Sequence, residues 1–484
     1  MTGFLVAGTS SDAGKSLVVT GLCRLARRRG IDVVPYKAQN MSNNSMVCPD
    51  GSEIGRAQYL QSIGAGVEAS ALMNPVLLKP GSDRSAFVVV RGQPAGTLEA
   101  GEYATDRRQL AEAAWSAHRE LADAHELVIC EGAGSPAEIN LRSGDYTNMG
   151  LARRFDLPVV LVGDIDRGGV LASIFGTWAL LDAEDRRLMA GYLINKFRGD
   201  QSVLDPGLAE ISRRTGLANL GVLPWIRGAW LDGEDSLDLG RWRDESVNRR
   251  IPGQPTPLRV AALAFPRISN ATDLDALAQE PGVDVILTSD PAEVLAADLA
   301  VLPGSRSTTS DLAWLRSRGL DDAITMRAER GLPVLGICGG FQMLARHIED
   351  GVESQGHHAA LGLLPADVTF HPDKVLRRAS GQWRGHPVDG YEIHHGRCAV
   401  DADAEEFLGG VHVGSVWGTM WHGSLESDNF RRAWLTSIAA LAGRDWTPDP
   451  TARGFAERRE HMINGIADAI EQAVDVDALL ALAR

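Results

Sequence analysis

The sequence predicts an α/β protein made of two doubly wound domains, each with a parallel sheet covered by helices. Two observations carry this prediction. Short apolar runs rich in β-branched residues alternate with amphipathic helical stretches along most of the chain, a pattern typical of parallel sheets with right-handed crossovers. In addition, 484 residues exceed what one hydrophobic core usually organises.

The candidate strands fall into two groups separated by a linker-like stretch. Residues 243–258 are rich in proline and charge, which is typical of a linker. We therefore expect a domain at 1–245, a linker at 246–257, a second domain at 258–450 and a helical tail at 451–484. The candidate strands are GFLVAG at 3–8, DVVPYK at 32–37, HELVICEG at 125–132, PVVLVGD at 158–164 and GYLINK at 191–196, then RVAALAF at 259–265, DVILTS at 284–289, LAVLPG at 299–304 and PVLGIC at 333–338.

The composition argues against several classes of partner. Asp and Glu total 63 against 48 Lys and Arg, for a formal net charge of -15, and an acidic protein has little non-specific attraction to nucleic acid or anionic membranes. No apolar run approaches the roughly 18 residues of a spanning helix, and the start of the sequence has no basic segment. We expect a cytoplasmic protein with neither partner. The five cysteines form no CxxC pair, so a disulfide framework or thiolate zinc site is not expected.

A phosphate-binding loop follows the first candidate strand. GTSSDAGKS at 8–16 precedes a helical run, and a loop in this position directs backbone N–H groups and the helix dipole at an anion. We expect Thr9, Asp12 and Gly14 to line the nucleotide phosphates, Lys15 to reach the terminal phosphates, and Ser16 to ligate Mg²⁺. The first glycine stands one residue earlier than in the standard motif. The alternative is a tight turn that merely contains GKS.

Carboxylates at later strand ends are candidate ligands for the same Mg²⁺, because this cation prefers oxygen ligands beside phosphates. Glu131 after HELVIC is the first candidate, followed by Asp164 and Asp166 after PVVLVG. Each of these acids has the alternative role of capping the following loop. Asn195, Lys196 and Asp200 in LINKFRGD are candidates for contacts to a base or phosphate, or are solvated loop residues.

A cysteine stands where a nucleophile is expected in the second domain. Cys338 lies between a buried strand and a helix and is flanked by Gly336, Gly339 and Gly340. This pattern indicates a nucleophile elbow, in which the following helix N-terminus favours the thiolate and Gly339 donates to an oxyanion. Such a thiolate can attack an amide. The cysteines at 23, 130 and 398 fit small buried apolar residues instead.

The thiol needs a base and a second oxyanion donor. His422 follows a β-like run and precedes a turn, which favours it as the base, while His394 and His395 in GYEIHHGRC remain rivals. The loop LPGSRSTTSDL places Gly304 and Ser305 after a strand. A backbone N–H in this loop, at Gly304, is expected to complete the oxyanion hole.

An ATP site and a cysteine amidohydrolase on one chain suggest a division of labour, in which one site activates a carboxylate and the other supplies ammonia. With this pairing, the sequence resembles the cobyric acid synthase family over nearly its whole length. The motifs that carry the resemblance are GTSSDAGKS at 8–16, YKAQNMSNNS at 36–45, DGSEIGRAQ at 50–58, MNPVLLKPGSDRS at 73–85, CEGAGSPAEINLR at 130–142, DIDRGG at 164–169, NKFRGD at 195–200, LPGSRST at 302–308, GICGGFQML at 336–344, YEIHHGR at 391–397 and WHGS at 421–424.

The resemblance implies an N-terminal P-loop amidoligase domain similar to dethiobiotin synthetase and a C-terminal class I glutamine amidotransferase domain. The family amidates the b, d, e and g carboxylates of adenosylcobyrinic acid a,c-diamide and uses ATP and glutamine for each amide. It also implies Cys338 as nucleophile and His422 as its base, while Lys15, Ser16 and Glu131 serve MgATP.

Two further roles follow from the resemblance. Lys37 is expected to hold a phosphate or substrate carboxylate, and Glu53 is a further candidate metal ligand. Many class I amidotransferases carry a glutamate two residues after the histidine, where this chain has Ser424. This subfamily generally lacks that glutamate, and Glu426 is the candidate from sequence for orienting His422.

Two other functions compete with this interpretation. The related enzyme that makes the a,c-diamide shares the architecture but not KAQNMSNNS. A partition-type ATPase switch shares deviant P-loops and would carry a degenerate amidase domain as a binding module. The intact elbow around Cys338 disfavours the switch.

Overall fold

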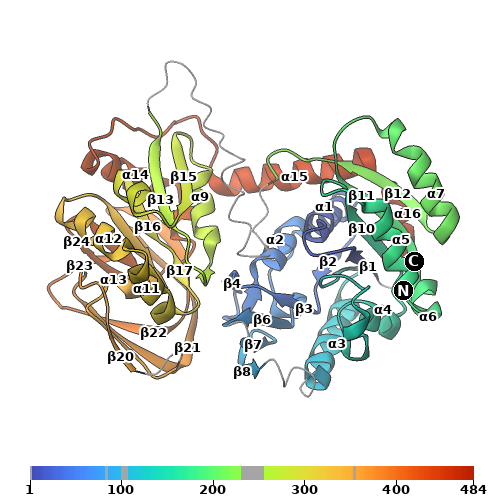
Figure 1. The fold of residues 1–484 in the computed structure, drawn as a ribbon, viewed down its shortest axis with the longest axis horizontal. Coiled ribbons are helices and arrows are strands. Elements are labelled where there is room, and N and C mark those ends of the chain that lie inside the picture. The colour runs from blue at the N-terminus through green and yellow to red at the C-terminus, as the bar shows by residue number, and fades with distance from the viewer. Residues whose placement is uncertain (1–2, 82–84, 100–106, 230–255, 353–355, 484) are drawn as a thin grey trace. The chain divides into compact units, whose positions relative to one another are not determined.

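The computed structural model describes residues 3–81, 85–99, 107–229, 256–352 and 356–483 (Figure 1). The chain divides into two compact units. The N-terminal unit comprises residues 1–41, 48–232 and 459–484, and the C-terminal unit comprises 42–47 and 233–458. Most of the predicted linker, residues 246–255, lies outside the described residues. The units are therefore not simple halves of the sequence, since each includes a segment from the other end of the chain.

The N-terminal unit is built on a six-stranded sheet whose paired strands are all parallel. Its strand order is β12-β11-β10-β1-β9-β2. The central strands are fully buried, as their continuous apolar runs require in a sheet covered on both faces. The bounds are β1 (Gly3–Gly8), β2 (Val33–Tyr36), β9 (Leu127–Glu131), β10 (Val159–Asp164), β11 (Met189–Phe197) and β12 (Ala218–Pro224).

Helices and a smaller sheet complete this unit. In the smaller sheet, β3 (Gln39–Met41) pairs in parallel with β6 (Val76–Pro80), which continues antiparallel through β7 (Ser85–Val90) to β8 (Gln93–Glu99). The short strand β5 (Glu53–Gly55) leads directly into α2. The helices are α1 (Lys15–Arg28), α2 (Arg56–Ala65), α3 (Arg107–Ala124), α4 (Met149–Phe155), α5 (Val170–Leu180), α6 (Ala183–Leu188) and α7 (Asp205–Thr215).

The C-terminal tail is helical, with α15 (Phe455–Ala473) and α16 (Val476–Ala481). From Arg459 onward it belongs to the N-terminal unit. A Cβ placed on Gly21 of α1 would lie 2.4 Å from the Ile470 side chain, so glycine permits α15 to approach α1 closely. Arg24 of α1 also pairs with Glu460 at 2.8 Å. The tail is thus an integral part of the N-terminal unit.

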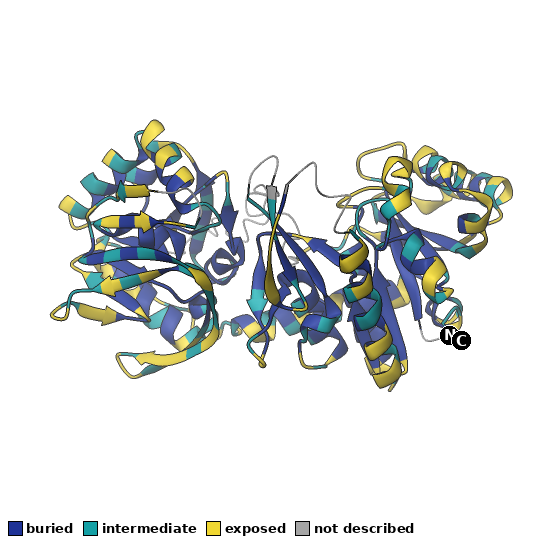
Figure 2. Cartoon of the chain, turned by 90° about the horizontal axis from the view of Figure 1, so that it is seen from below, coloured by how far each residue is buried: buried dark blue, intermediate teal, exposed yellow. Residues whose placement is uncertain are grey.

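The C-terminal unit contains a seven-stranded sheet in the order β15-β13-β16-β18-β25-β24-β23. The first five strands pair in parallel, and β24 and β23 add an antiparallel edge. Figure 2 shows the central strands of both large sheets as buried. The bounds are β13 (Leu258–Leu263), β15 (Val283–Thr288), β16 (Leu299–Leu302), β18 (Val334–Ile337), β23 (Glu405–Phe407), β24 (Gly410–Val413) and β25 (Val416–Thr419).

A second sheet in this unit has the order β20-β19-β21-β22 and is dominated by a long antiparallel hairpin. The hairpin is formed by β21 (Ala366–Trp383) and β22 (His386–Val400), which the sequence analysis did not anticipate. Its polar, half-exposed side chains do not form the apolar runs that mark buried strands. The remaining elements are β14 (Ile268–Ser269), β17 (Gly304–Ser305), β19 (His347–Asp350), β20 (Gly356–Ala359), α9 (Asp275–Ala278), α10 (Pro291–Ala296), α11 (Thr308–Ser317), α12 (Leu320–Glu329), α13 (Gly339–Leu344) and α14 (Asp428–Leu441).

The predicted α/β fold class with two parallel sheets is confirmed. All nine candidate strands are present, and their ends differ from the predicted ends by at most two residues. Among the described residues, no helix is both long enough and apolar enough to cross a membrane.

Candidate functional sites

The loop between β1 and α1 has the geometry of a phosphate cradle. Asp12 and Gly14 adopt positive φ angles of 56° and 98°, which turn the chain sharply before the helix. A Cβ at Gly14 would lie 2.0 Å from the Asn195 side-chain nitrogen, so the position also lacks room for a side chain. The backbone N–H of Thr9 donates to Val162 O at 2.9 Å, which continues the sheet into the loop.

Residues of the LINKFRGD segment hydrogen-bond the backbone of the loop between β1 and α1. Asn195 Nδ2 donates to Ala13 O at 3.0 Å, and Lys196 Nζ donates to Asp12 O at 2.9 Å. Lys196 also pairs with Asp164 at 2.8 Å. These contacts assign Asn195 and Lys196 to holding the loop backbone. Asp200, by contrast, caps a short 3₁₀ turn through the Ser202 N–H.

Lys15 and Ser16 lie at the start of α1 and reach the end of β9. Lys15 Nζ donates to Ser10 O at 3.1 Å and to Gly134 O at 3.3 Å, in the loop after β9. Ser16 Oγ donates to Glu131 Oε1 at 2.9 Å. The structure therefore brings together three residues that the sequence analysis placed at one nucleotide site, Lys15, Ser16 and Glu131.

Glu131 is fully buried among donors. Lys37 Nζ lies 2.9 Å from its Oε1, and Gln61 Nε2 donates to its Oε2 at 2.5 Å. Burial alone would raise the pKa of Glu131, but the positive charges of Lys37 and Lys15 and these hydrogen bonds lower it below its ordinary value. The carboxylate is thus held ionised, as a metal ligand must be.

The residues present fit a magnesium ion. Within the described residues no three His, Cys, Asp or Glu side chains gather into a metal cluster, but protein Mg²⁺ sites commonly use only one or two side chains together with phosphate and water oxygens. Ser16 and Glu131 supply such a pair. Glu53, the other metal candidate, is fully buried and pairs with Lys79 at 2.5 Å.

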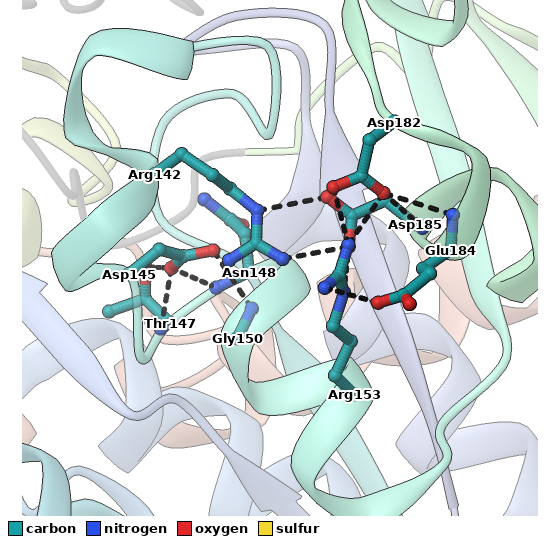
Figure 3. A network of polar contacts seen from close by, with 9 residues as sticks. All are labelled: Arg142, Asp145, Thr147, Asn148, Gly150, Arg153, Asp182, Glu184 and Asp185. Carbon is teal, nitrogen blue, oxygen red and sulfur yellow. Dashed lines mark hydrogen bonds and ion pairs between the residues drawn. The ribbon is translucent and has the colours of Figure 1, made fainter.

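The loop that follows Glu131 is fixed by a polar network (Figure 3). Arg142 makes a bidentate contact with Asp185 at 2.9 and 2.8 Å, and Arg153 donates to the same carboxylate at 2.5 Å. Asp145 accepts from the Asn148 N–H at 2.9 Å, and Asn148 Nδ2 donates to Ala133 O at 2.6 Å. The network anchors the loop that presents its backbone to Lys15.

Cys338 occupies a strained turn between β18 and α13. Its φ of 50° and ψ of -106° are unusual for a residue with a side chain, as in nucleophile elbows. A Cβ at Gly340 would lie 1.9 Å from Leu302 O, and one at Gly336 would lie 2.7 Å from Phe341 N. The flanking glycines are required because the turn packs against neighbouring backbone.

His422 lies at this turn, and Asp273 holds it. Its Nδ1 is 2.7 Å from Asp273 Oδ2, and Asp273 Oδ1 accepts from the Gly423 N–H at 2.7 Å. Burial alone would lower the pKa of His422, but the Asp273 carboxylate and the Cys338 sulfur attract and hydrogen-bond the imidazolium and raise it to about 10. The three side chains form a buried Cys–His–Asp set.

The two residues predicted to line the oxyanion hole, Gly304 and Gly339, lie close to His422 and to the 304–305 loop, respectively. A Cβ at Gly304 would be 2.9 Å from His422 Cε1, and one at Gly339 would be 2.7 Å from Ser305 N. The Cys338 N–H is engaged with Thr419 O at 2.7 Å. The backbone of the 304–305 loop and the start of α13 therefore flank the thiol.

The rival histidines differ from His422 in environment. Burial lowers the pKa of His394 to about 4. His395 Nδ1 lies 3.0 Å from His371 O. Burial also raises the pKa values of the thiols of Cys23, Cys130 and Cys398. None of these cysteines lies at an elbow.

Asp273 is the functional candidate that sequence reasoning missed. It lies 149 residues before His422, in the 3₁₀ turn Ala271–Leu274. Two contacts anchor this turn: Asn44 Oδ1 accepts from the Ala271 N–H at 3.1 Å, and the Ser45 N–H donates to Asn270 Oδ1 at 2.8 Å. Asn44 and Ser45 belong to the C-terminal unit despite their early place in the sequence.

Comparison with protein families gives two matches, one over the segment that contains the six-stranded sheet and one over the segment that contains the seven-stranded sheet. Residues 4–230 match the model of the CobQ/CobB/MinD/ParA nucleotide binding domain. Residues 259–430 match the CobB/CobQ-like glutamine amidotransferase domain. The ATP site and the amidotransferase site predicted from the motifs thus fall in domains of those kinds.

Curated relatives match over the full length. A cobyric acid synthase of Cutibacterium acnes is 64% identical, with all of both chains covered. Cobyric acid synthases of Mycolicibacterium gilvum and Mycobacterium tuberculosis are 52% and 53% identical and are covered over 97% of their length. This chain belongs to the cobyric acid synthase family, which is the family that its motifs predict, and is an ATP-dependent glutamine amidotransferase.

Proposed function

We propose that this enzyme amidates the b, d, e and g carboxylates of adenosylcobyrinic acid a,c-diamide to give adenosylcobyric acid, with one ATP and one glutamine for each amide. The observation that carries the proposal is a phosphate cradle and a Cys–His–Asp set on one chain, in a sequence that matches cobyric acid synthases from end to end. ATP, glutamine and the diamide are its small-molecule substrates. We place the reaction in the cytoplasm, where ATP and glutamine are available.

The C-terminal unit supplies ammonia. The Cys338 thiolate attacks the glutamine amide carbon, the C–N bond breaks, and His422 gives its proton to the departing ammonia. His422 then takes a proton from water, which attacks the thioester and releases glutamate and the thiol. Asp273 orients the imidazole, and the backbone N–H groups at Gly304 and Gly339 stabilise the oxyanion in both steps.

The N-terminal unit activates the acceptor. An acceptor carboxylate oxygen attacks the γ-phosphorus of ATP, the bond to the bridging oxygen breaks, and ADP leaves. Ammonia then attacks the acyl carbon, phosphate departs, and the nitrogen loses a proton to give the amide. Lys15 and the loop backbone at Thr9, Asp12 and Gly14 neutralise the phosphates during transfer.

Ser16 and Glu131 would hold Mg²⁺, which when bound offsets the negative charge of the β- and γ-phosphates. If Glu131 turns to a cation, Lys37 loses an ionic partner and its ammonium becomes available to a phosphate or the acceptor carboxylate. Glu53 stays a candidate further ligand. Glu131→Gln should raise the Mg²⁺ concentration for half-maximal amidation at least about tenfold and leave glutamine hydrolysis intact. An unchanged Mg²⁺ requirement would remove Glu131 from the metal site.

The substrate experiment compares two acceptors. Purified protein with ATP and glutamine receives either cobyrinic acid or its a,c-diamide, and the products are identified by mass. Amidation of the diamide alone supports the proposal. Amidation of cobyrinic acid at its a and c positions would assign the chain to the related diamide-forming activity instead.

One synthetase site must process four similar carboxylates, so we expect the acceptor to leave and rebind between amidations. Time-resolved product analysis should then detect free tri-, tetra- and pentaamides before the hexaamide accumulates. Formation of the hexaamide with no free intermediate would contradict release and rebinding, but not the overall reaction.

A further inference from the structure

Three of the sequence motifs meet around Gly55 in the N-terminal unit. A Cβ on Gly55 would lie 2.8 Å from Asn40 Nδ2, 2.7 Å from Gln58 Oε1 and 2.8 Å from Asn74 Oδ1. Asn40 comes from the motif at 36–45, Gln58 from 50–58 and Asn74 from 73–85. We call Asn40, Gln58 and Asn74 the amide cluster. Each of the three side chains is at most 1% exposed.

The three amides differ in their hydrogen bonding. Asn74 Nδ2 donates to Lys37 O at 3.3 Å and to Val76 O at 3.0 Å, and its Oδ1 accepts from the Gly55 N–H at 3.2 Å. Among the described residues, neither the oxygen nor the nitrogen of the Asn40 or Gln58 amide has a partner. A buried polar group without a partner costs about 1–3 kcal/mol. Asn74 therefore has a structural role, whereas Asn40 and Gln58 have hydrogen-bonding capacity that the fold does not use.

The amide cluster is connected to the synthetase site by a short chain of contacts. Asn74 binds the Lys37 carbonyl, the Lys37 ammonium pairs with Glu131, and Glu131 accepts from Ser16 at the start of α1. Gln58 and Gln61 are also neighbours on one face of α2 because they are three residues apart. Gln61 donates to Glu131. The amide cluster is thus linked to Glu131 in two ways, through Asn74 and Lys37 and through Gln61 on α2.

We propose that Asn40 and Gln58 form the subsite for the acceptor's carboxyl group, an inference that rests on the proposed function. Their N–H groups hold one carboxylate oxygen while the other attacks the γ-phosphorus. After ammonia replaces phosphate, an Asn40 or Gln58 oxygen accepts a hydrogen bond from the product amide. Amide side chains suit this task because each offers both an N–H donor for the carboxylate and an oxygen acceptor for the product amide.

The subsite is tested with apolar variants of similar size. In Asn40→Leu and Gln58→Met, the KM for the acceptor diamide should rise at least about tenfold, because hydrogen bonds to a charged group are lost. The KM for ATP and the rate of glutamine hydrolysis should not change. Because the fold does not use these amides, the melting temperature should stay constant or rise.

Asn74→Leu is the matched control, since it removes a buried amide from the same cluster that is fully hydrogen-bonded. It should lower the melting temperature by about 3 °C or more. If Asn40→Leu and Gln58→Met lower the melting temperature as Asn74→Leu does and leave the acceptor KM unchanged, their amides are structural and the subsite is wrong. Wild-type protein assayed in parallel separates the two proposals, because absence of amidation by wild type would overturn the function itself.

Discussion

The two units place their reactive residues at the same point of a parallel sheet but prepare them differently. In each, a central strand ends in a glycine-containing turn that leads into a helix. In the N-terminal unit the charges compensate one another, as in the Lys37–Glu131 pair. In the C-terminal unit, Cys338 and His422 lie together with Asp273 behind the imidazole. The Cys338, His422 and Asp273 side chains are therefore in contact without a ligand, whereas the Mg²⁺ site proposed at Glu131 requires that carboxylate to exchange its pairing with Lys37.

The largest expected effect separates the two sites completely. Cys338→Ala should reduce glutamine-dependent amidation by about 10⁵-fold or more, because loss of a covalent nucleophile removes most of a triad's contribution. Amidation with added ammonium salt should persist. Cys398→Ala removes a thiol of raised pKa from outside the elbow and should keep both activities. If ammonia-dependent amidation disappears with Cys338, the two sites do not work as independent catalysts.

The next effect concerns Asp273. Asp273→Asn should lower glutamine hydrolysis about 100- to 10,000-fold, since an amide cannot stabilise the imidazolium and favours the wrong tautomer. Because the pKa of His422 should fall, the basic limb of the kcat/KM profile should move to lower pH. Asp275→Asn changes a buried aspartate two residues away and should lower the rate less than threefold. If both variants lose glutamine hydrolysis equally and the pH profile of kcat/KM does not change, Asp273 has only a structural role.

A smaller effect is expected at Lys15, where the substitution should lower amidation and spare glutamine hydrolysis. Lys15→Ala should lower amidation with either glutamine or ammonia about 100- to 1,000-fold, by loss of one electrostatic contact to the transferring phosphoryl group. Glutamine hydrolysis measured without ATP should change less than twofold. A parallel loss of hydrolysis would show that the amidohydrolase site is not preassembled.

The smallest effect is a pH dependence of stability. His422 has a pKa near 10 in the folded state against about 6.5 unfolded, so its contribution is complete below about pH 6.5 and is lost as the pH rises toward 10. The melting temperature of wild type should fall more steeply between pH 7 and 10 than that of Asp273→Asn, by about 3 °C or more. Parallel curves would show that Asp273 does not set the charge of His422.

Sequence reasoning found the features that are local in the chain. The P-loop and the elbow are each encoded within about ten consecutive residues, so strand, turn and helix could be predicted together. Asp273 could not be assigned, because its role depends on a contact with a residue 149 positions away. Glu426, the candidate from sequence, is not the acid that contacts His422 Nδ1, since Asp273 occupies that position. The amide cluster contains one residue from each of three separate motifs. The spacing of residues within one motif does not show which other motifs lie next to it in the fold.

The exchange of short segments between the units has a consequence for dissecting this protein. A fragment with the bounds of the predicted second domain, residues 258–450, would lack Asn44 and Ser45. These two residues hydrogen-bond the turn that carries Asp273. A fragment of residues 1–245 would lack α15, which packs against α1. Each unit is therefore assembled from discontinuous segments of the chain, and no single continuous fragment contains all the parts of either one without parts of the other.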